Sequence, residues 1–152
     1  MRRCRHQLVL TVAAAIALAA ALPAGASDLA LSAADGSSVR WSEWIAANGP
    51  AAVLVWASWA PAAPAAVDGL PMLAEAARSQ GLKLVVVDVQ EELEAARRGL
   101  ERAAVPWLHD RHGAILKQYR LIQLPILLVV DQDGRELATL APNAESLRRL
   151  ER

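Results

Sequence analysis

The chain has 152 residues, 55% of them hydrophobic, so it is long enough for one folded domain and too apolar for a disordered chain. Its 16 basic and 16 acidic side chains cancel, and the part that follows the first 26 residues carries a net charge of −3. This balance argues against a nucleic-acid or an anionic-membrane partner.

The first 26 residues have the order of a secretory signal peptide. A basic stretch at 1–6 precedes an uncharged run from Leu8 to Leu22, then Pro23 and the small residues Ala24-Gly25-Ala26. The apolar run of 15 residues is shorter than the roughly 20 that a membrane-spanning helix needs. We therefore predict a signal peptide at 1–26 and export of a domain at 27–152 that does not contact the membrane after cleavage. An uncleaved N-terminal anchor is the alternative.

Cysteine usage sets the strongest limit on chemistry. The only cysteine in the chain is Cys4, which lies inside the predicted leader and before its apolar run. After cleavage the domain would hold no thiol and could form no disulfide, although an exported protein enters a compartment that permits them.

The first half of the domain indicates strands that alternate with helices. Asp35-Gly36 marks a hairpin turn, and Ser42 is a candidate cap for a short helix that runs to Ala47. The apolar run at 51–58 is typical of a strand buried on both faces. A helix follows over 62–80, which Pro71 must bend or break.

The second half continues this alternation and then ends in a hairpin and a helix. The predicted elements are a strand at 82–89, a helix at 91–104 with a solvated charged face, an extended piece at 105–109, a helix at 113–120, strands at 126–130 and 136–140, and a final helix capped by Asn143. Helices between strands imply parallel pairing, and the late hairpin adds antiparallel strands. The predicted fold is an α/β three-layer sandwich with a mixed central sheet.

Several segments, in order, resemble the thioredoxin superfamily, and in particular the bacterial TlpA/ResA group of periplasmic proteins. Residues 51–66 read AAVLVWASWAPAAPAA, where the group has a pattern close to FWASWCPPCRxE. Leu124-Pro125 precedes ILLVVDQDGRE, which is similar to the group's proline, apolar strand and hairpin. Residues 105–110 and the upstream LALSAADGSSVRW also resemble the group, the latter its extra N-terminal hairpin. The resemblance implies a thioredoxin-like fold over nearly the whole exported part.

The departures from the group's pattern decide what chemistry to expect. Ala60 and Ala63 occupy the two cysteine positions, and Ala66 stands where many relatives have a glutamate. Leu54 aligns with the buried aspartate of thioredoxin, and the helix kink falls at Pro71, one turn later than usual. Thiol–disulfide exchange needs an attacking thiolate and a resolving thiol, and peroxidase chemistry also begins at a thiolate. We therefore predict that the protein is not an enzyme.

Without the two cysteines, the resemblance still implies a surface that binds peptides. In relatives, the proline aligned with Pro125 is cis, lies beside the redox motif, and the backbone before it pairs with an extended substrate segment. We predict a redox-inactive peptide-binding, protein-binding or chaperone-like module in the bacterial periplasm, with Trp59 as its recognition residue or as a half-buried helix cap. The predicted binding residues are Trp59, Ala60, Pro61, Ala62, Ala63, Leu124 and Pro125.

Two other functions remain as alternatives for the whole protein. One is a TlpA/ResA-like thiol–disulfide oxidoreductase that assists cytochrome or oxidase maturation, as relatives do. The other is a decayed gene product without a binding role, against which the consistent caps, hairpins and apolar faces argue.

Smaller motifs lie outside the redox positions. Ser58 could be a hydrolase nucleophile only with a base in reach, and His109 and His112 lie in a segment that relatives place elsewhere. The run His109-Asp110-Arg111-His112 could bind a metal, but it is more typical of solvated surface, so we predict neither metal nor other cofactor. Met72 is predicted to fill a gap in the core.

Overall fold

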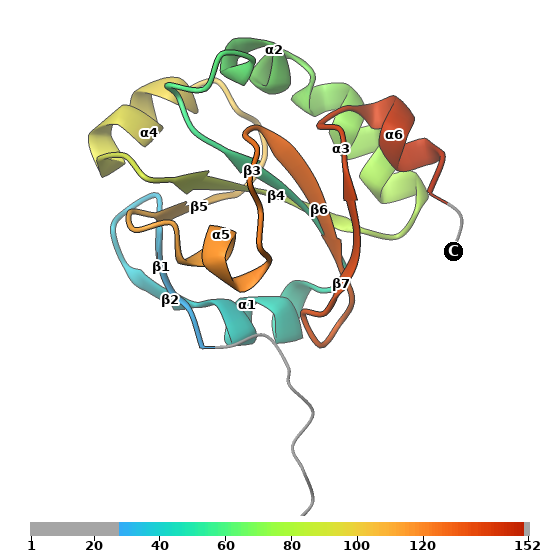
Figure 1. Ribbon diagram of the computed structural model, residues 1–152, viewed down its shortest axis with the longest axis horizontal. Helices are drawn as coiled ribbons and strands as arrows, with labels where there is room; N and C mark the ends of the chain where they lie inside the picture. The colour runs from blue at the N-terminus through green and yellow to red at the C-terminus, as the bar shows by residue number, and fades with distance from the viewer. Residues whose placement is uncertain (1–27, 151–152) are drawn as a thin grey trace, which may run out of the picture.

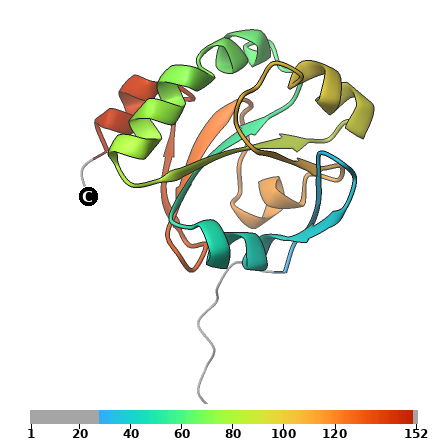
Figure 2. The ribbon, with the colours of Figure 1, turned by 180° about the vertical axis from the view of Figure 1, so that it is seen from behind.

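The computed structural model describes residues 28–150, which form one seven-stranded mixed sheet with helices on both faces (Figures 1 and 2). The signal peptide predicted at 1–26 lies outside this range. The strands are β1 (Ala30–Ala33), β2 (Ser38–Arg40), β3 (Ala51–Trp56), β4 (Lys83–Val89), β5 (Trp107–Asp110), β6 (Ile126–Val130) and β7 (Glu136–Leu140). The helices are α1 (Trp41–Asn48), α2 (Ala63–Asp68), α3 (Leu70–Ser79), α4 (Leu93–Gly99), α5 (Ala114–Gln118) and α6 (Ala144–Arg148).

The strand order β2-β1-β5-β4-β3-β6-β7 confirms the predicted mixed sheet. β3 pairs in parallel with β4, and β4 in parallel with β5, while the remaining pairs are antiparallel. Because β3, β4 and β5 run in the same direction, their carboxyl ends meet at one edge of the sheet, where ligand sites of α/β folds tend to lie.

Two apolar layers sandwich the sheet, because alternate residues of its buried central strands point to opposite faces. One layer joins the sheet to α2, α3 and α6, and includes Leu54, Leu73 and Leu147. The other joins it to α1 and α5, and includes Trp41 and Ile115. Figure 1 shows these helices above and below the sheet, which confirms the predicted three-layer arrangement.

The predicted helix break and final cap are present. Gly69 separates α2 from α3, with Pro71 in the first turn of α3, where a missing backbone N–H costs least. Asn143 caps α6, since its side chain accepts a hydrogen bond from the Ser146 N–H at 2.9 Å.

Three details of the sequence prediction are wrong. Helix α1 begins one residue before Ser42, whose hydroxyl instead contacts Asp28 at 3.3 Å. Met72 is 61% exposed, because α3 buries Leu70, Leu73 and Ala77 and turns Met72 outward. Helix α4 covers only seven of the fourteen residues predicted for it, and it ends at Gly99.

Gly99 lies directly against the indole ring of the buried Trp56. A Cβ atom at position 99 would lie 2.4 Å from Cη2 of Trp56, far inside van der Waals contact. We expect Gly99→Ala to lower the free energy of unfolding by about 1–3 kcal/mol, the usual range for overpacking a core. Urea denaturation measures this, with Gly69→Ala as the matched control, because a Cβ there is no closer than 3.4 Å to any neighbour. Equal effects of the two substitutions would contradict the prediction.

Candidate functional site

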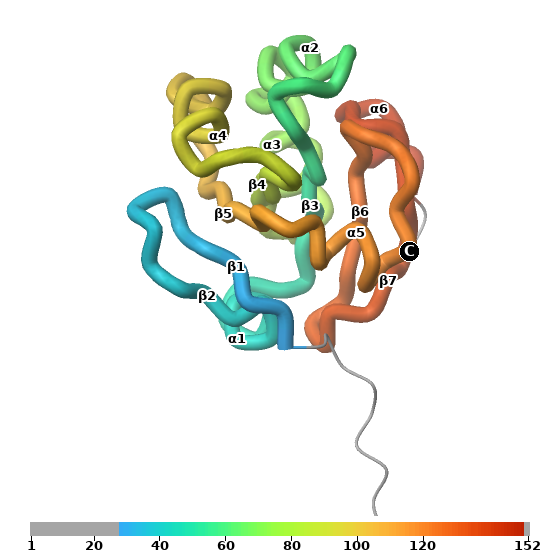
Figure 3. The backbone as a smooth tube through the Cα atoms, turned by 60° about the vertical axis from the view of Figure 1, so that its left-hand side comes forward, coloured from blue at the N-terminus to red at the C-terminus, as the bar shows by residue number. Residues whose placement is uncertain are grey.

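The degenerate motif and the proline loop lie side by side at the carboxyl end of β3. The chain leaves β3 at Trp56, turns, and enters α2 at Ala63. β6 is antiparallel to β3 with Ile126 opposite Val55, so the Leu124–Pro125 segment enters the sheet beside this turn. The Leu124–Pro125 peptide bond is cis. Figure 3 shows the β3–α2 connection and the start of β6 at the same end of the molecule.

The two redox positions are part of the core rather than of the surface. Ala60 is 3% exposed and Ala63 is 1% exposed, and both belong to the apolar layer that contains Trp56. Trp56 also holds the turn in place, because its indole N–H donates a hydrogen bond to the carbonyl oxygen of Ala63 at 2.9 Å. The two methyl groups are buried under the start of α2, so the side chains of Ala60 and Ala63 expose little area at the surface predicted for them.

The remaining predicted residues divide between surface and interior. Trp59 is 57% exposed, which excludes the half-buried cap, and Pro61 and Ala62 are exposed as well. Leu124 is half-buried and Pro125 is buried.

Sequence reasoning missed Ile122, which is 95% exposed three residues before Pro125. A β-branched aliphatic side chain in the short loop ahead of the matched proline was the signal available. We call Trp59, Pro61, Ala62, Ile122 and Leu124 the Trp59 surface.

A cluster of polar side chains borders the turn between β3 and α2, and the sequence did not predict that these side chains lie together. The carboxylate of Glu91 accepts hydrogen bonds from the Ser58 N–H at 2.9 Å and from the Ser58 hydroxyl. In the next strands, Nδ1 of His109 lies 2.6 Å from Oδ2 of Asp88, and the two residues are register partners of β5 and β4. We call Asp88, Glu91 and His109 the acid cluster.

Burial and mutual repulsion set the charges of this cluster. Burial, followed by the neighbouring Glu91 and Asp110 carboxylates, raises the pKa of Asp88 to about 9. Burial also acts to raise the pKa of Glu91, but the Asp88 carboxyl and the hydrogen bonds from Ser58 outweigh it, and the net pKa is lowered. Burial lowers the pKa of His109, against the negative charges of Asp110 and Glu91. At neutral pH the acid cluster therefore combines an ionised Glu91 with one proton shared by the Asp88–His109 pair.

The sequence prediction of a solvated His109-Asp110 segment is wrong. His109 and Asp110 are 5% and 3% exposed, because β5 lies between β1 and β4 inside the sheet. Asp110 accepts a hydrogen bond from the Ile115 N–H at 2.8 Å at the start of α5, which is a structural role.

The geometry gives Ser58 no histidine base, since its hydroxyl donates to Glu91. Within residues 28–150 no group of three or more histidine, cysteine, aspartate or glutamate side chains is placed to hold a metal ion.

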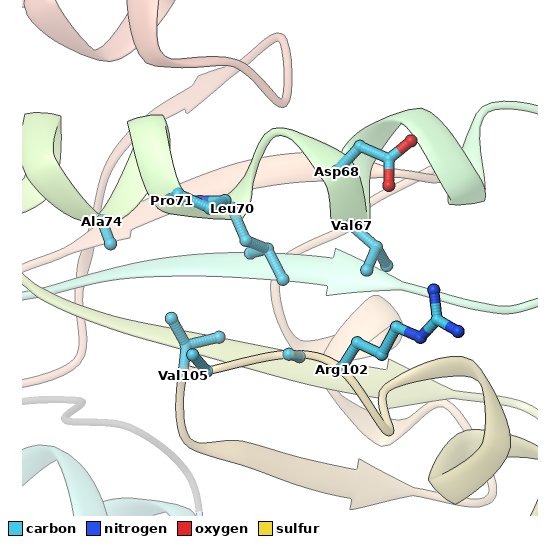
Figure 4. Close-up of a pocket in the computed structure, with 9 residues that line it drawn as sticks. Val67, Asp68, Leu70, Pro71, Ala74, Arg102 and Val105 are labelled. Carbon is cyan, nitrogen blue, oxygen red and sulfur yellow. The ribbon is translucent and has the colours of Figure 1, made fainter.

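A groove flanks α2 and α3 on the side of the α4–β5 connection (Figure 4). It has a volume of about 310 Å³, and Val67, Leu70 and Ala74 line one wall opposite Arg102 and Val105. In the figure, the side chains of Val67 and Leu70 point across the groove towards Arg102 and Val105. The groove adds an apolar surface next to the helix that follows the degenerate motif.

Several solved structures share this architecture, and some of them are thiol–disulfide proteins. A putative thiol:disulfide interchange protein DsbE from Chlorobium tepidum is 20% identical, with a TM-score of 0.61 over 76% of this chain and 81% of that chain. A thiol-disulfide oxidoreductase from Bacteroides fragilis is 21% identical, with a TM-score of 0.63 over 76% and 88%. StoA from Bacillus subtilis is 19% identical, with a TM-score of 0.59 over 79% and 92%. At these identities the likeness shows the fold.

The mixed sheet, the helix after β3 and the proline loop beside it thus define a thioredoxin-like fold. The AhpC/TSA family matches residues 24–135, and the chain belongs to that family. No curated protein matches the sequence. Among the described residues, no helix is both long and apolar enough to cross a membrane.

Proposed function

We propose that this protein is a periplasmic thioredoxin-like binding module that holds a peptide or protein segment on the Trp59 surface and does not exchange disulfides. The observation that carries the proposal is the replacement of both redox cysteines by alanines that are built into the core, in a chain whose only cysteine is Cys4. Cleavage of the signal peptide predicted at 1–26 would remove the thiol of Cys4 as well.

The chemical part of the proposal follows from the lack of a nucleophile. Disulfide exchange forms a mixed disulfide through a thiolate and resolves it through a second thiol. The start of α2 retains the backbone N–H groups that would stabilise a thiolate, but Ala60 and Ala63 carry only methyl groups. Peroxide reduction also begins at a cysteine thiolate, so the same lack applies to it.

The binding part of the proposal rests on what remains exposed at the site. Trp59 and Ile122 are two of the four large hydrophobic side chains exposed within residues 28–150, and both lie in segments that meet beside the end of β3. Exposed tryptophan side chains are typical anchors of protein interfaces. An extended segment could also pair with the backbone that precedes Pro125, as in strand addition.

Replacement of Trp59 tests the binding surface. We expect Trp59→Ala to weaken binding to peptides selected by the wild-type protein on a peptide array by roughly tenfold or more, the effect of losing an aromatic anchor. Leu137→Ala is the matched control, because Leu137 is 55% exposed but lies on β7, outside the Trp59 surface. Equal binding by wild type and Trp59→Ala, or an equal loss in the control, would argue against this surface.

The alternative is a thiol–disulfide oxidoreductase that assists cytochrome or oxidase maturation. Its thiol–disulfide part is supported by the likeness to the Chlorobium tepidum and Bacteroides fragilis proteins. Insulin reduction by the processed protein separates the two functions. We expect no turnover above the dithiothreitol background, and clear turnover would overturn the proposed function in favour of the alternative.

A further inference from the structure

We propose that Glu91 is the positioning residue of the Trp59 surface, and that its hold on the Ser58–Trp59 turn is released when the Glu91 carboxylate is protonated. The inference deepens the proposed function, on which it rests for the role of Trp59 in binding. It makes the position of Trp59 on that surface depend on pH.

The contacts of Glu91 reach the turn directly. Both carboxylate oxygens are used on one residue, with the Ser58 N–H at 2.9 Å on Oε1 and the Ser58 hydroxyl on Oε2. Ser58 immediately precedes Trp59, and the turn closes through a hydrogen bond from the Ala60 N–H to the Ala57 carbonyl at 3.1 Å. A side chain 33 residues further along the chain thus fixes the residue before the exposed indole.

Glu91 is itself placed by the backbone between β4 and α4. Gln90 has a positive φ of 57°, and its N–H donates to the Asp110 carbonyl at 3.1 Å, which bends the chain as it leaves the sheet. Residue 91 therefore leaves the direction of β4, and its side chain reaches the end of β3 instead of joining the solvated face of α4.

The groups that face Glu91 come from three sides. Asp88 comes from β4, His109 from β5 and Ser58 from the turn after β3. Asp110 of β5 acts on Asp88 and His109. Further out, Glu92 and Arg111 form an ion pair at 2.6 Å, and both act on His109.

Asp88 is the deepest of these groups. It is 0% exposed, and its Oδ1 has no hydrogen-bond partner among residues 28–150. A second negative charge beside Glu91 is unfavourable there, so the pair keeps one proton at neutral pH and that proton stays with Asp88 and His109.

This arrangement makes the acceptor strength of Glu91 depend on pH in the acid range. The pKa of Glu91 is lowered, so its carboxylate persists into mildly acidic solution and is neutralised only at lower pH. A neutral carboxylic acid accepts hydrogen bonds more weakly than a carboxylate does. Protonation therefore loosens both bonds to Ser58 and frees the Trp59 turn.

The test follows Trp59 itself and needs no partner. The protein is labelled with 5-fluorotryptophan, and the ¹⁹F resonance of Trp59 is assigned by its loss in Trp59→Phe. In the wild type we expect this resonance to move in one acid titration step. In Glu91→Gln, which mimics the protonated carboxyl, we expect the resonance to start near the acid-form position and to lose the step. Glu91→Asp, which restores a carboxylate, should bring the step back.

Glu92→Gln is the matched control, because Glu92 is the adjacent carboxylate but bonds to Arg111 and not to Ser58. It should keep the wild-type titration. A Trp59 resonance in Glu91→Gln that follows the wild-type pH profile, or an equal loss of the step in Glu92→Gln, would overturn the inference. A normal step in a protein that binds no array peptide at any pH would count against the proposed function alone.

Discussion

The variant Ala60→Cys with Ala63→Cys is expected to regain a closable disulfide and to reduce insulin, whereas the wild type does not. The two positions lie across the start of α2, where backbone N–H groups lower the pKa of a thiol. Because both side chains point into the core, the thiols should react more slowly than those of an oxidoreductase with an exposed cysteine. Thiol titration before and after oxidation measures the disulfide, and insulin turbidity measures turnover.

The single variants Ala60→Cys and Ala63→Cys are the controls, since one thiol cannot resolve a mixed disulfide. They should show a titratable thiol but no sustained turnover. A double variant that folds with two free thiols and never closes them would show that the turn no longer has redox geometry. The chain would then have diverged in backbone as well as in side chains.

The second large effect is expected in the pH dependence of stability. The pKa of Asp88 is about 9 in the folded protein against 3.8 ordinarily, so the folded state retains a proton that the unfolded state releases. The contribution of this proton to the free energy of unfolding is complete below pH 3.8 and is lost as the pH rises towards 9. Each pH unit in that interval costs up to about 1.4 kcal/mol of unfolding free energy for one proton.

His109 acts in the opposite direction. Its pKa is lowered from 6.5, so below about pH 6.5 the unfolded state binds a proton more readily than the folded state does. The free energy of unfolding therefore falls as the pH is lowered through this range. The two slopes oppose each other there, and the net decline should be visible mainly between about pH 7 and 9. Urea denaturation at several pH values measures it.

Asp88→Asn should flatten this decline and make the variant more stable than the wild type near pH 9, because a neutral amide removes the ionisable group. Asp68→Asn is the control, because Asp68 is exposed on α2 and should leave the slope unchanged. If Asp88→Asn keeps the full wild-type slope, another group is responsible for the decline.

Local patterns in the sequence were sufficient for most of the fold. Runs of β-branched residues define β4 and β6 because such residues pack well in a buried sheet. Pro71 and Asn143 mark helix boundaries through backbone chemistry that acts within one turn. These signals depend only on near neighbours, so they survive in a single sequence.

The candidate site was less predictable because it depends on pairing between distant segments. Asp88 lies within a strand that the sequence predicts only as buried, and its partner His109 follows 21 residues later. Glu91 was assigned to a solvated helix face because the turn at Gln90 is not visible in the periodicity. The inward packing of Ala60 and Ala63 likewise depends on how closely α2 approaches Trp56.

The strand order leaves β2 and β7 as the two borders of the sheet. β2 has only three residues, and its Arg40 is paired with Asp28 at 2.5 Å, so it offers little template for another chain. β7 carries the charged Glu136, and its register with β6 shifts between Val129 and Val130, which interrupts a regular ladder. Both borders therefore oppose stacking of one copy on the next. A domain that exposes the indole of Trp59 and the side chain of Ile122 can thus avoid edge-to-edge association through its sheet.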